Sequence, residues 1–235
     1  MKGIIEAALR EKRNLTEAES YEVLGLRGLP VPDFQLVSSI DEVEEAADRV
    51  GFPLVMKVVS PDILHKTEVG GIRVKIDSKE AARTAFRDII SSVREKQPEA
   101  RIHGIMMVPQ AEEGLEVIVG MKRDQQFGPT VMFGLGGVFI EVLKDVSLRV
   151  SPVTEEEAEE MLLEIKGRKL LEGYRGKPPK DLKALKKIIM EISQLAADIP
   201  EIAELDLNPI IVYEDGAIIV DAAIIVDDKG NEQAV

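Results

Sequence analysis

The chain contains no cysteine and no tryptophan, and only two of its 235 residues are histidine. Without thiols it can form no disulfide, no thiolate nucleophile and no cysteine-bound zinc site, and two imidazoles cannot build a three-histidine metal centre. A metal ion would therefore have to bind oxygen ligands. Long apolar runs are missing too, since no segment approaches the roughly 18 residues of a membrane span. The start Met1–Glu6 lacks the apolar stretch of a signal peptide, so we expect a cytoplasmic protein without a membrane partner.

Basic residues are outnumbered, because 30 Lys and Arg stand against 43 Asp and Glu and give a net charge of −13. This excess of negative charge disfavours binding to nucleic acids or to anionic membranes, and we expect no nucleic-acid partner. Hydrophobic residues make up 45% of the chain, which is enough to fill a substantial core. The sequence therefore predicts a folded chain of one large domain or two small ones.

Helical and strand patterns alternate along the whole chain. Apolar spacing predicts two helices within 2–26, further helices at 41–51, 78–93, 154–165 and 182–197, and strands at 34–37, 54–59, 72–76, 102–108, 115–120, 130–134, 138–143, 210–213 and 217–221. Thr16 and Glu19 form a capping-box pattern before the second helix. The polar run 109–114 is typical of a connector between two lobes.

Lys57 interrupts the otherwise apolar strand 54–59. A buried ammonium is costly unless an anion compensates it, so a buried Lys57 would indicate an anionic ligand. A lysine on the solvated face of the strand is the equally good alternative, because strand side chains alternate between faces.

The loop 60–71 combines an imidazole, a cation, a hydroxyl and two glycines, namely His65, Lys66, Thr67, Gly70 and Gly71. Glycines permit close approach, and successive backbone N–H groups can bind an anion, so this set suits a polyphosphate. The pattern matches neither a Walker loop nor a Rossmann glycine fingerprint. A lone loop histidine is most often simply exposed, which is the alternative reading of His65.

The stretch 204–209 reads Glu-Leu-Asp-Leu-Asn-Pro, with Asp206 and Asn208 two residues apart. In an extended segment both side chains point to the same face, and Asp221, at the end of the following strand, would approach Asn208 in an antiparallel pairing. Such oxygen ligands suit magnesium completed by substrate phosphates. An Asx turn before Pro209 is the alternative. Glu116, at the start of another strand, is either a hydrogen-bond partner for a ribose hydroxyl or a solvated edge residue.

Four motifs in this order resemble one known family: Gly51–Lys57, His65–Gly71, Phe133–Gly137 and Glu204–Pro209. The chain resembles, from about Ser20 to Asp227, the ATP-grasp nucleotide-binding subunit of ADP-forming acyl-CoA (acetyl-CoA) synthetases, which are relatives of the succinyl-CoA synthetase beta subunit. The resemblance implies an α/β (α+β) ATP-grasp fold with two lobes, each a mainly antiparallel sheet flanked by helices. It places a helical segment at 1–25 and lobes at 26–109 and 110–235.

Residue by residue, the resemblance implies that Lys57 contacts the phosphates of ATP or ADP and that the loop with Lys66 and Thr67 covers them. Glu116 would hold the nucleotide beyond a backbone hinge that begins with Met107 and Val108. Asn208 and Asp221 would hold Mg²⁺. His65 would carry phosphate, and Asp206 would support the phosphohistidine. The succinyl-CoA branch has glycine at the position of His65, so the histidine favours the acyl-CoA branch.

The implied reaction is acyl-CoA + ADP + phosphate ⇌ carboxylic acid + CoA + ATP. It needs a CoA-binding alpha subunit with its own phosphorylated histidine, in an alpha2-beta2 assembly, so the chain would be an acid–thiol ligase only together with that partner. Two alternatives remain open: another ATP-grasp ligase that makes an acyl phosphate, and a non-catalytic nucleotide-sensing module.

Overall fold

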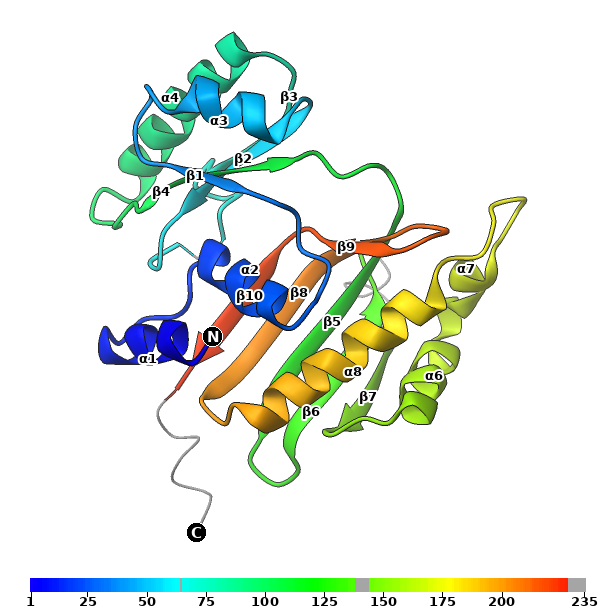
Figure 1. The fold of residues 1–235 in the computed structure, drawn as a ribbon. Helices are drawn as coiled ribbons and strands as arrows, with labels where there is room; N and C mark the ends of the chain where they lie inside the picture. Colours follow the sequence, from blue (N-terminus) through cyan, green and yellow to red (C-terminus); the bar gives the residue numbers. More distant parts are fainter. Residues whose placement is uncertain (64, 138–143, 228–235) are drawn as a thin grey trace. The chain divides into compact units, whose positions relative to one another are not determined.

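The structure is a computed structural model, and it describes residues 1–63, 65–137 and 144–227. Contacts divide the chain into two compact units: unit 1 consists of Met1–Val31 and Glu113–Val235, and unit 2 of Pro32–Glu112. The path of the chain through both can be followed in Figure 1. Each unit is described by itself below.

Unit 2 is a four-stranded antiparallel sheet covered by two helices (Figure 1). The strand order is β1-β4-β2-β3. The elements are β1 (Gln35–Val37), α3 (Val43–Val50), β2 (Leu54–Val59), β3 (Ile72–Ile76), α4 (Lys79–Lys96) and β4 (Gly104–Pro109). The expected helix and strand positions in this part are confirmed, and α3 ends before Gly51, whose φ of 85° terminates a helix readily.

The core of unit 2 lies between this sheet and its helices. Leu54, Met56 and Val58 of β2 pack there with apolar residues of both helices. The helix α4 begins at the N-cap Ser78, whose hydroxyl accepts a hydrogen bond from the N–H of Ala81. All members of this core lie between Val37 and Met107 and hence within unit 2.

Unit 1 is built on a six-stranded sheet, in which β10-β8-β5-β6-β7 are neighbours and β9 also pairs with β8. The strands are β5 (Leu115–Asp124), β6 (Gly128–Leu135), β7 (Val146–Val150), β8 (Ile202–Val212), β9 (Ala217–Ile219) and β10 (Ala222–Val226). In the described part of unit 1, these strands all pair antiparallel. The predicted hairpin around Gly216 is confirmed as β8–β9.

Helices α6 (Glu155–Glu164) and α8 (Leu182–Asp198) pack on this sheet, α8 against β5 and β6 and α6 against β7. Figure 1 shows α8 in front of the sheet, running in roughly the same direction as its strands. Between them lie the 3₁₀ turn η1 (Lys166–Arg168) and the short α7 (Lys169–Glu172), which the sequence did not predict. The strands β7 and β10 were not predicted either, and the predicted strand 138–143 lies outside the described residues.

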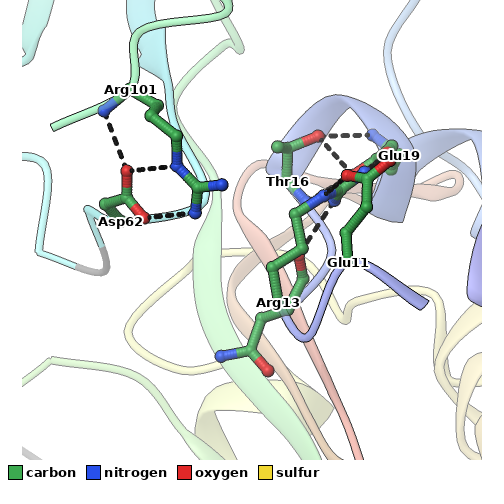
Figure 2. Close-up of polar contacts among 7 residues, drawn as sticks. Glu11, Arg13, Thr16, Glu19, Asp62 and Arg101 are labelled. Carbon is green, nitrogen blue, oxygen red and sulfur yellow. Dashed lines mark hydrogen bonds and ion pairs between the residues drawn. The ribbon is translucent and has the colours of Figure 1, made fainter. Parts of the chain in front are cut away.

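The N-terminal helices α1 (Lys2–Arg10) and α2 (Glu17–Leu26) pack on the C-terminal strand β10. The N–H of Leu15, between them, donates to the carbonyl of Ile224 at 3.2 Å. The capping box of Thr16 and Glu19 is confirmed, and Arg13 adds two hydrogen bonds to the Glu19 carboxylate (Figure 2). The N-terminal helices are thus an integral part of unit 1.

None of the helices in the described part of the chain is long and apolar enough to cross a membrane.

Candidate functional site

Lys57 lies at the centre of unit 2, paired with Ile72 of β3 and with Met106 of β4. It is only 4% exposed, so the alternative of a lysine on a solvated face is wrong. Strand alternation turns Lys57 away from the core that takes up Met56 and Val58. A buried ammonium on this face is the environment that favours an anionic ligand.

The loop that carries His65 is fixed at both ends by apolar residues. Ile63 and Val69 are buried in the core of unit 2, whereas His65 and Thr67 are exposed and Lys66 is half-buried. Leu64 lies outside the described residues. The loop therefore presents its polar side chains outward from two buried anchors.

An ion pair reinforces the start of this loop. The backbone N–H, Nε and Nη2 of Arg101 all donate to the Asp62 carboxylate, at 2.8, 3.0 and 2.7 Å (Figure 2). These bonds lower the pKa of Asp62 from its ordinary value of 3.8 to about 2. At the other end, Nζ of Lys96 donates to the carbonyl of Glu68 at 2.7 Å. The segment between Asp62 and Glu68 is thus held at two points.

The glycines at the end of the loop close a turn. The N–H of Gly70 donates to Thr67 and the N–H of Gly71 to Lys66, at 3.0 and 2.7 Å. Both N–H groups, which the sequence suggested as donors to an anion, therefore bond within the loop instead. Glycine is needed here for space, because a Cβ on Gly71 would lie 2.5 Å from Cγ1 of Val58 and one on Gly70 2.5 Å from Oγ of Ser92. A role of both residues in nucleotide binding stays a prediction.

Met107 and Val108 lie inside β4 rather than in a flexible hinge. Met107 pairs with Gln35 on one side and Met56 on the other, and its side chain belongs to the core. The pairing with β1 ends at Met107, so Val108 is in register only with Val55 of β2. The strand β4 ends at Pro109, and unit 2 continues to Glu112. A role of Met107 and Val108 in nucleotide binding stays a prediction.

Glu116 lies exposed near the start of β5 in unit 1, next to the glycine motif after β6. The N–H of Gly136 donates to the carbonyl of Glu116 at 2.8 Å. A Cβ on Gly136 would lie 2.9 Å from Cβ of Glu116, too close for any other residue. The glycine motif thus allows a tight backbone approach, which fixes the backbone that carries Glu116.

Asp206 and Asn208 project from β8 on the same, exposed side, while Leu205 and Leu207 between and beside them are buried. The predicted shared face is therefore confirmed. Partial burial, and then the negative charges of Asp221 and Glu204, raise the pKa of Asp206. Carboxylates that repel one another in this way favour a cation or a proton between them.

Asp221 follows β9 and lies next to Asn208, as predicted. The N–H of Asn208 donates to the carbonyl of Asp221 at 3.2 Å, and the N–H of Val220 to the carbonyl of Pro209 at 2.9 Å. Unit 1 thus brings Asp206, Asn208 and Asp221 together. Glu116 comes from the neighbouring strand β5, in which Gly120 pairs with Asp206.

The oxygen donors of Asn208 and Asp221 fit magnesium, which binds few protein groups and keeps water and substrate oxygens in the rest of its shell. Among the described residues, no group of three or more His, Cys, Asp or Glu side chains is arranged to hold a metal by itself. A structural zinc or calcium cage is thus absent from this part of the chain, whereas a two-ligand magnesium site does not need one.

Several residues that shape the site could not be identified from the sequence. Tyr21 and Glu17 of α2 are buried beside the segment of Asp221, and the electrostatic influence of Asp221 reaches Tyr21. Asp62 and Arg101 are far apart in the sequence, and nothing in their surroundings predicts their contact.

Comparison with known proteins identifies the class. Residues 6–226 match the family model of the ATP-grasp domain, so the chain belongs to the ATP-grasp family. Within it, the chain is 49% identical, over 94% of its length and 96% of the relative, to the beta subunit of acetate–CoA ligase (ADP-forming) I of Pyrococcus furiosus. It therefore belongs with the beta subunits of ADP-forming acetate–CoA ligases.

Two further similarities are informative. Acetate–CoA ligase (ADP-forming) I of Archaeoglobus fulgidus is 42% identical over 96% of this chain, but the chain spans only 33% of that longer protein. Acetyl-coenzyme A synthetase 1 of Ca. Korarchaeum cryptofilum, in complex with coenzyme A and Ca-AMPCP, superposes with a TM-score of 0.94, 43% identity and coverage of 96% and 99% of the two chains. The same enzyme was also solved with Mg-AMPPCP and a phosphohistidine segment pointing towards the nucleotide-binding site, with a TM-score of 0.85, 40% identity and the same coverage.

Proposed function

We propose that this chain is the nucleotide-binding beta subunit of an ADP-forming acyl-CoA synthetase. It transfers phosphate between ATP/ADP and a histidine during the reaction acyl-CoA + ADP + phosphate ⇌ carboxylic acid + CoA + ATP. The observation that carries the proposal is the cluster on β8, where Asp206 and Asn208 share one face and Asn208 is bonded to the backbone of Asp221.

Each unit contributes groups that suit a nucleotide. From unit 2, the buried ammonium of Lys57 and the side chains of Lys66 and Thr67 bind phosphates, because cations and hydroxyls stabilise the charge on a transferring phosphoryl group. The backbone of β4 at Met107 and Val108 binds the base. Glu116 of unit 1 accepts hydrogen bonds from the ribose.

Asn208 and Asp221 hold magnesium through their side-chain oxygens, with the phosphates of the nucleotide completing the coordination. When bound, the ion neutralises negative charge on the phosphates. The raised pKa of Asp206 supports this assignment, because it reflects an excess of negative charge that a cation would relieve.

His65 accepts the phosphoryl group. One neutral imidazole nitrogen forms a bond to the γ-phosphorus, the bond to the oxygen of ADP breaks, and ADP leaves with that electron pair. Asp206 is the proposed carboxylate that supports the phosphohistidine, because a carboxylate stabilises the cationic form of an imidazole. The anchored loop supports this role, since His65 is exposed between the buried residues Ile63 and Val69.

The remaining chemistry belongs to a CoA-binding alpha subunit. The P. furiosus relative is one subunit of its enzyme, and the A. fulgidus relative carries about two thirds of its length outside the matched part. We propose an alpha2-beta2 assembly in the cytoplasm, in which the alpha subunit selects the acid and exchanges phosphate with His65.

The test uses the full-length chain with Mg²⁺ and ATP labelled at the γ-phosphate. We expect an acid-labile, base-stable label on His65, which His65→Ala abolishes while MgADP still binds, and which the control His103→Ala retains. With the alpha subunit, acetyl-CoA, ADP and phosphate should yield ATP. Unchanged labelling of His65→Ala would exclude the carrier role, and binding without any transfer, even with the partner, would favour a nucleotide sensor.

A further inference from the structure

The hydroxyl of Tyr21, in the N-terminal helix α2, donates to the backbone carbonyl of Val220 at 2.5 Å. Tyr21 is 1% exposed, so water cannot replace this bond if it is lost. The contact joins residues 199 positions apart in the sequence. It therefore ties Val220, in the C-terminal part of unit 1, to the N-terminal helix α2.

That point is the residue before Asp221. Three backbone hydrogen bonds hold the same short segment: Ile219 N–H to Pro30 at 2.8 Å, Val220 N–H to Pro209 at 2.9 Å, and Asn208 N–H to Asp221 at 3.2 Å. The carbonyl of Val220, by contrast, accepts from a side chain. The segment between β9 and β10 is thus held by strand β8 on one side and by α2 and the chain that follows it on the other.

Peptide planarity makes the Tyr21 contact relevant to Asp221. The carbonyl of Val220 lies in one rigid plane with the N–H and Cα of Asp221. A hydrogen bond to that oxygen therefore restricts rotation of the plane, and with it the direction in which the Asp221 side chain leaves the backbone. Asn208 N–H restricts the next peptide plane, on the other side of the same Cα.

The surroundings of Tyr21 keep its hydroxyl protonated. Burial raises its pKa most, and the negative charges of Glu17 and Asp221 raise it further. Glu17 is itself buried, at 5% exposure. The hydroxyl therefore remains a neutral donor at neutral pH.

We propose that Tyr21 is a positioning residue of the magnesium site: through the carbonyl of Val220 it holds Asp221 in the orientation that binds the metal. The inference rests on the proposed function, which makes Asp221 a ligand. Helix α2 thus contributes to nucleotide binding as well as to packing.

The test is the magnesium dependence of ADP binding, measured by calorimetry on the full-length chain at a series of MgCl₂ concentrations. Tyr21→Phe removes one oxygen and keeps the ring in the core. We expect the Mg²⁺ concentration for half-maximal binding to rise by about three- to ten-fold, the effect of one neutral hydrogen bond. Tyr174→Phe, which alters an exposed tyrosine of unit 1, is the matched control and should leave it unchanged.

Two readouts separate positioning from mere stabilisation. Saturating Mg²⁺ should restore tight ADP binding to Tyr21→Phe, although a lower melting temperature would persist. In a double-mutant cycle, Tyr21→Phe should add little to Asp221→Asn, because both act on the same ligand. Replacing Tyr21 by 4-aminophenylalanine, which keeps a donor at the same place, should rescue the Mg²⁺ dependence and also serves if Tyr21→Phe folds poorly.

The outcomes distinguish the two hypotheses. A changed melting temperature with unchanged Mg²⁺ dependence in Tyr21→Phe would overturn the positioning role while leaving the proposed function intact. Unchanged Mg²⁺ dependence in Asp221→Asn would instead overturn the metal assignment in the proposed function, and the inference with it.

Discussion

Lys57 is buried in β2, an inner strand of the sheet of unit 2. Lys57→Met keeps an unbranched side chain of similar length at this position, so the variant should still melt cooperatively but should bind ADP about ten- to a hundred-fold more weakly, the range of a charge-assisted hydrogen bond. Thermal melting and calorimetry measure the two effects. Lys75→Met, at an exposed lysine of the neighbouring strand β3, should alter neither. A destabilised variant with normal ADP binding would contradict the assignment.

The ionised carboxylate of Asp206 lowers the stability of the folded protein, although the proposed function requires it. Its pKa is raised, so the folded state binds this proton more tightly than the unfolded state, and stability is lost as the pH rises above the ordinary pKa of 3.8. At neutral pH, Asp206→Asn should therefore raise the melting temperature of the protein while it abolishes phosphate transfer to His65. Labelled ATP and thermal melting at pH 7 check both. Loss of stability would indicate that Asp206 is a structural residue.

Single residues also mark where prediction from the sequence ends. Alternation along a strand predicted that Asp206 and Asn208 share a face, and this is confirmed, because it depends only on local geometry. The burial of Lys57 stayed open, since it depends on the neighbouring strands β3 and β4 and not on its own strand. The contact of Tyr21 could not be predicted from the sequence, because its partner Val220 is 199 residues away.

At the scale of elements, the loop of His65 depends on the ion pair between Asp62 and Arg101 (Figure 2). The pKa of Asp62 is lowered to about 2 from 3.8, so the pair stabilises the folded state above pH 4, and this contribution is lost as the pH falls through about 2. Asp62→Asn should therefore be less stable than the wild type in urea at pH 5–7, with a difference that shrinks below pH 4. A difference independent of pH would exclude the ion pair as its cause.

The helix α2 depends on its capping box. Thr16→Ala removes the acceptor for the N–H of Glu19 and the partner of its carboxylate, and should lower the free energy of unfolding by about 1 kcal/mol. Urea denaturation measures the loss. Thr84→Ala, within the exposed face of α4, is the control and should change stability by no more than about 0.5 kcal/mol. Equal losses in both variants would argue against the cap as a source of stability.

Elements with strong local signals were predicted, and elements that depend on distant partners were not. Capping residues and apolar spacing located α2, α4, α6 and α8. The strand β7 was missed although its apolar and polar residues alternate, and the structure reverses the expected faces, with Ser147 buried and Leu148 exposed. The strand β10 was missed because only Val220 and Asp221 separate it from β9. The glycines of the His65 loop were interpreted as anion donors, whereas the structure uses their N–H groups to close a turn.

At the scale of the whole molecule, the two units differ in how the chain builds them. Unit 2 is one continuous segment, and its core contains only its own residues. Residues 32–112 expressed alone should therefore fold cooperatively, with a sharp thermal transition and dispersed amide signals in NMR. The segment 113–227, which lacks α1 and α2, should not, because β10 would lose the helices that cover it. A segment 32–112 that stays unfolded, or a segment 113–227 that folds cooperatively, would contradict this interpretation.

The packing of the N-terminal helices on the last strand has a consequence for synthesis. The first helices leave the ribosome long before the strand that receives them, since about 190 residues separate Val31 from Ala222. At roughly 5–20 residues per second, they wait on the order of ten to forty seconds for their partner. Throughout that interval the carbonyl of Val220 is not yet available to Tyr21, so the corner formed by Tyr21, Asn208 and Asp221 is completed only after Asp221 has been translated.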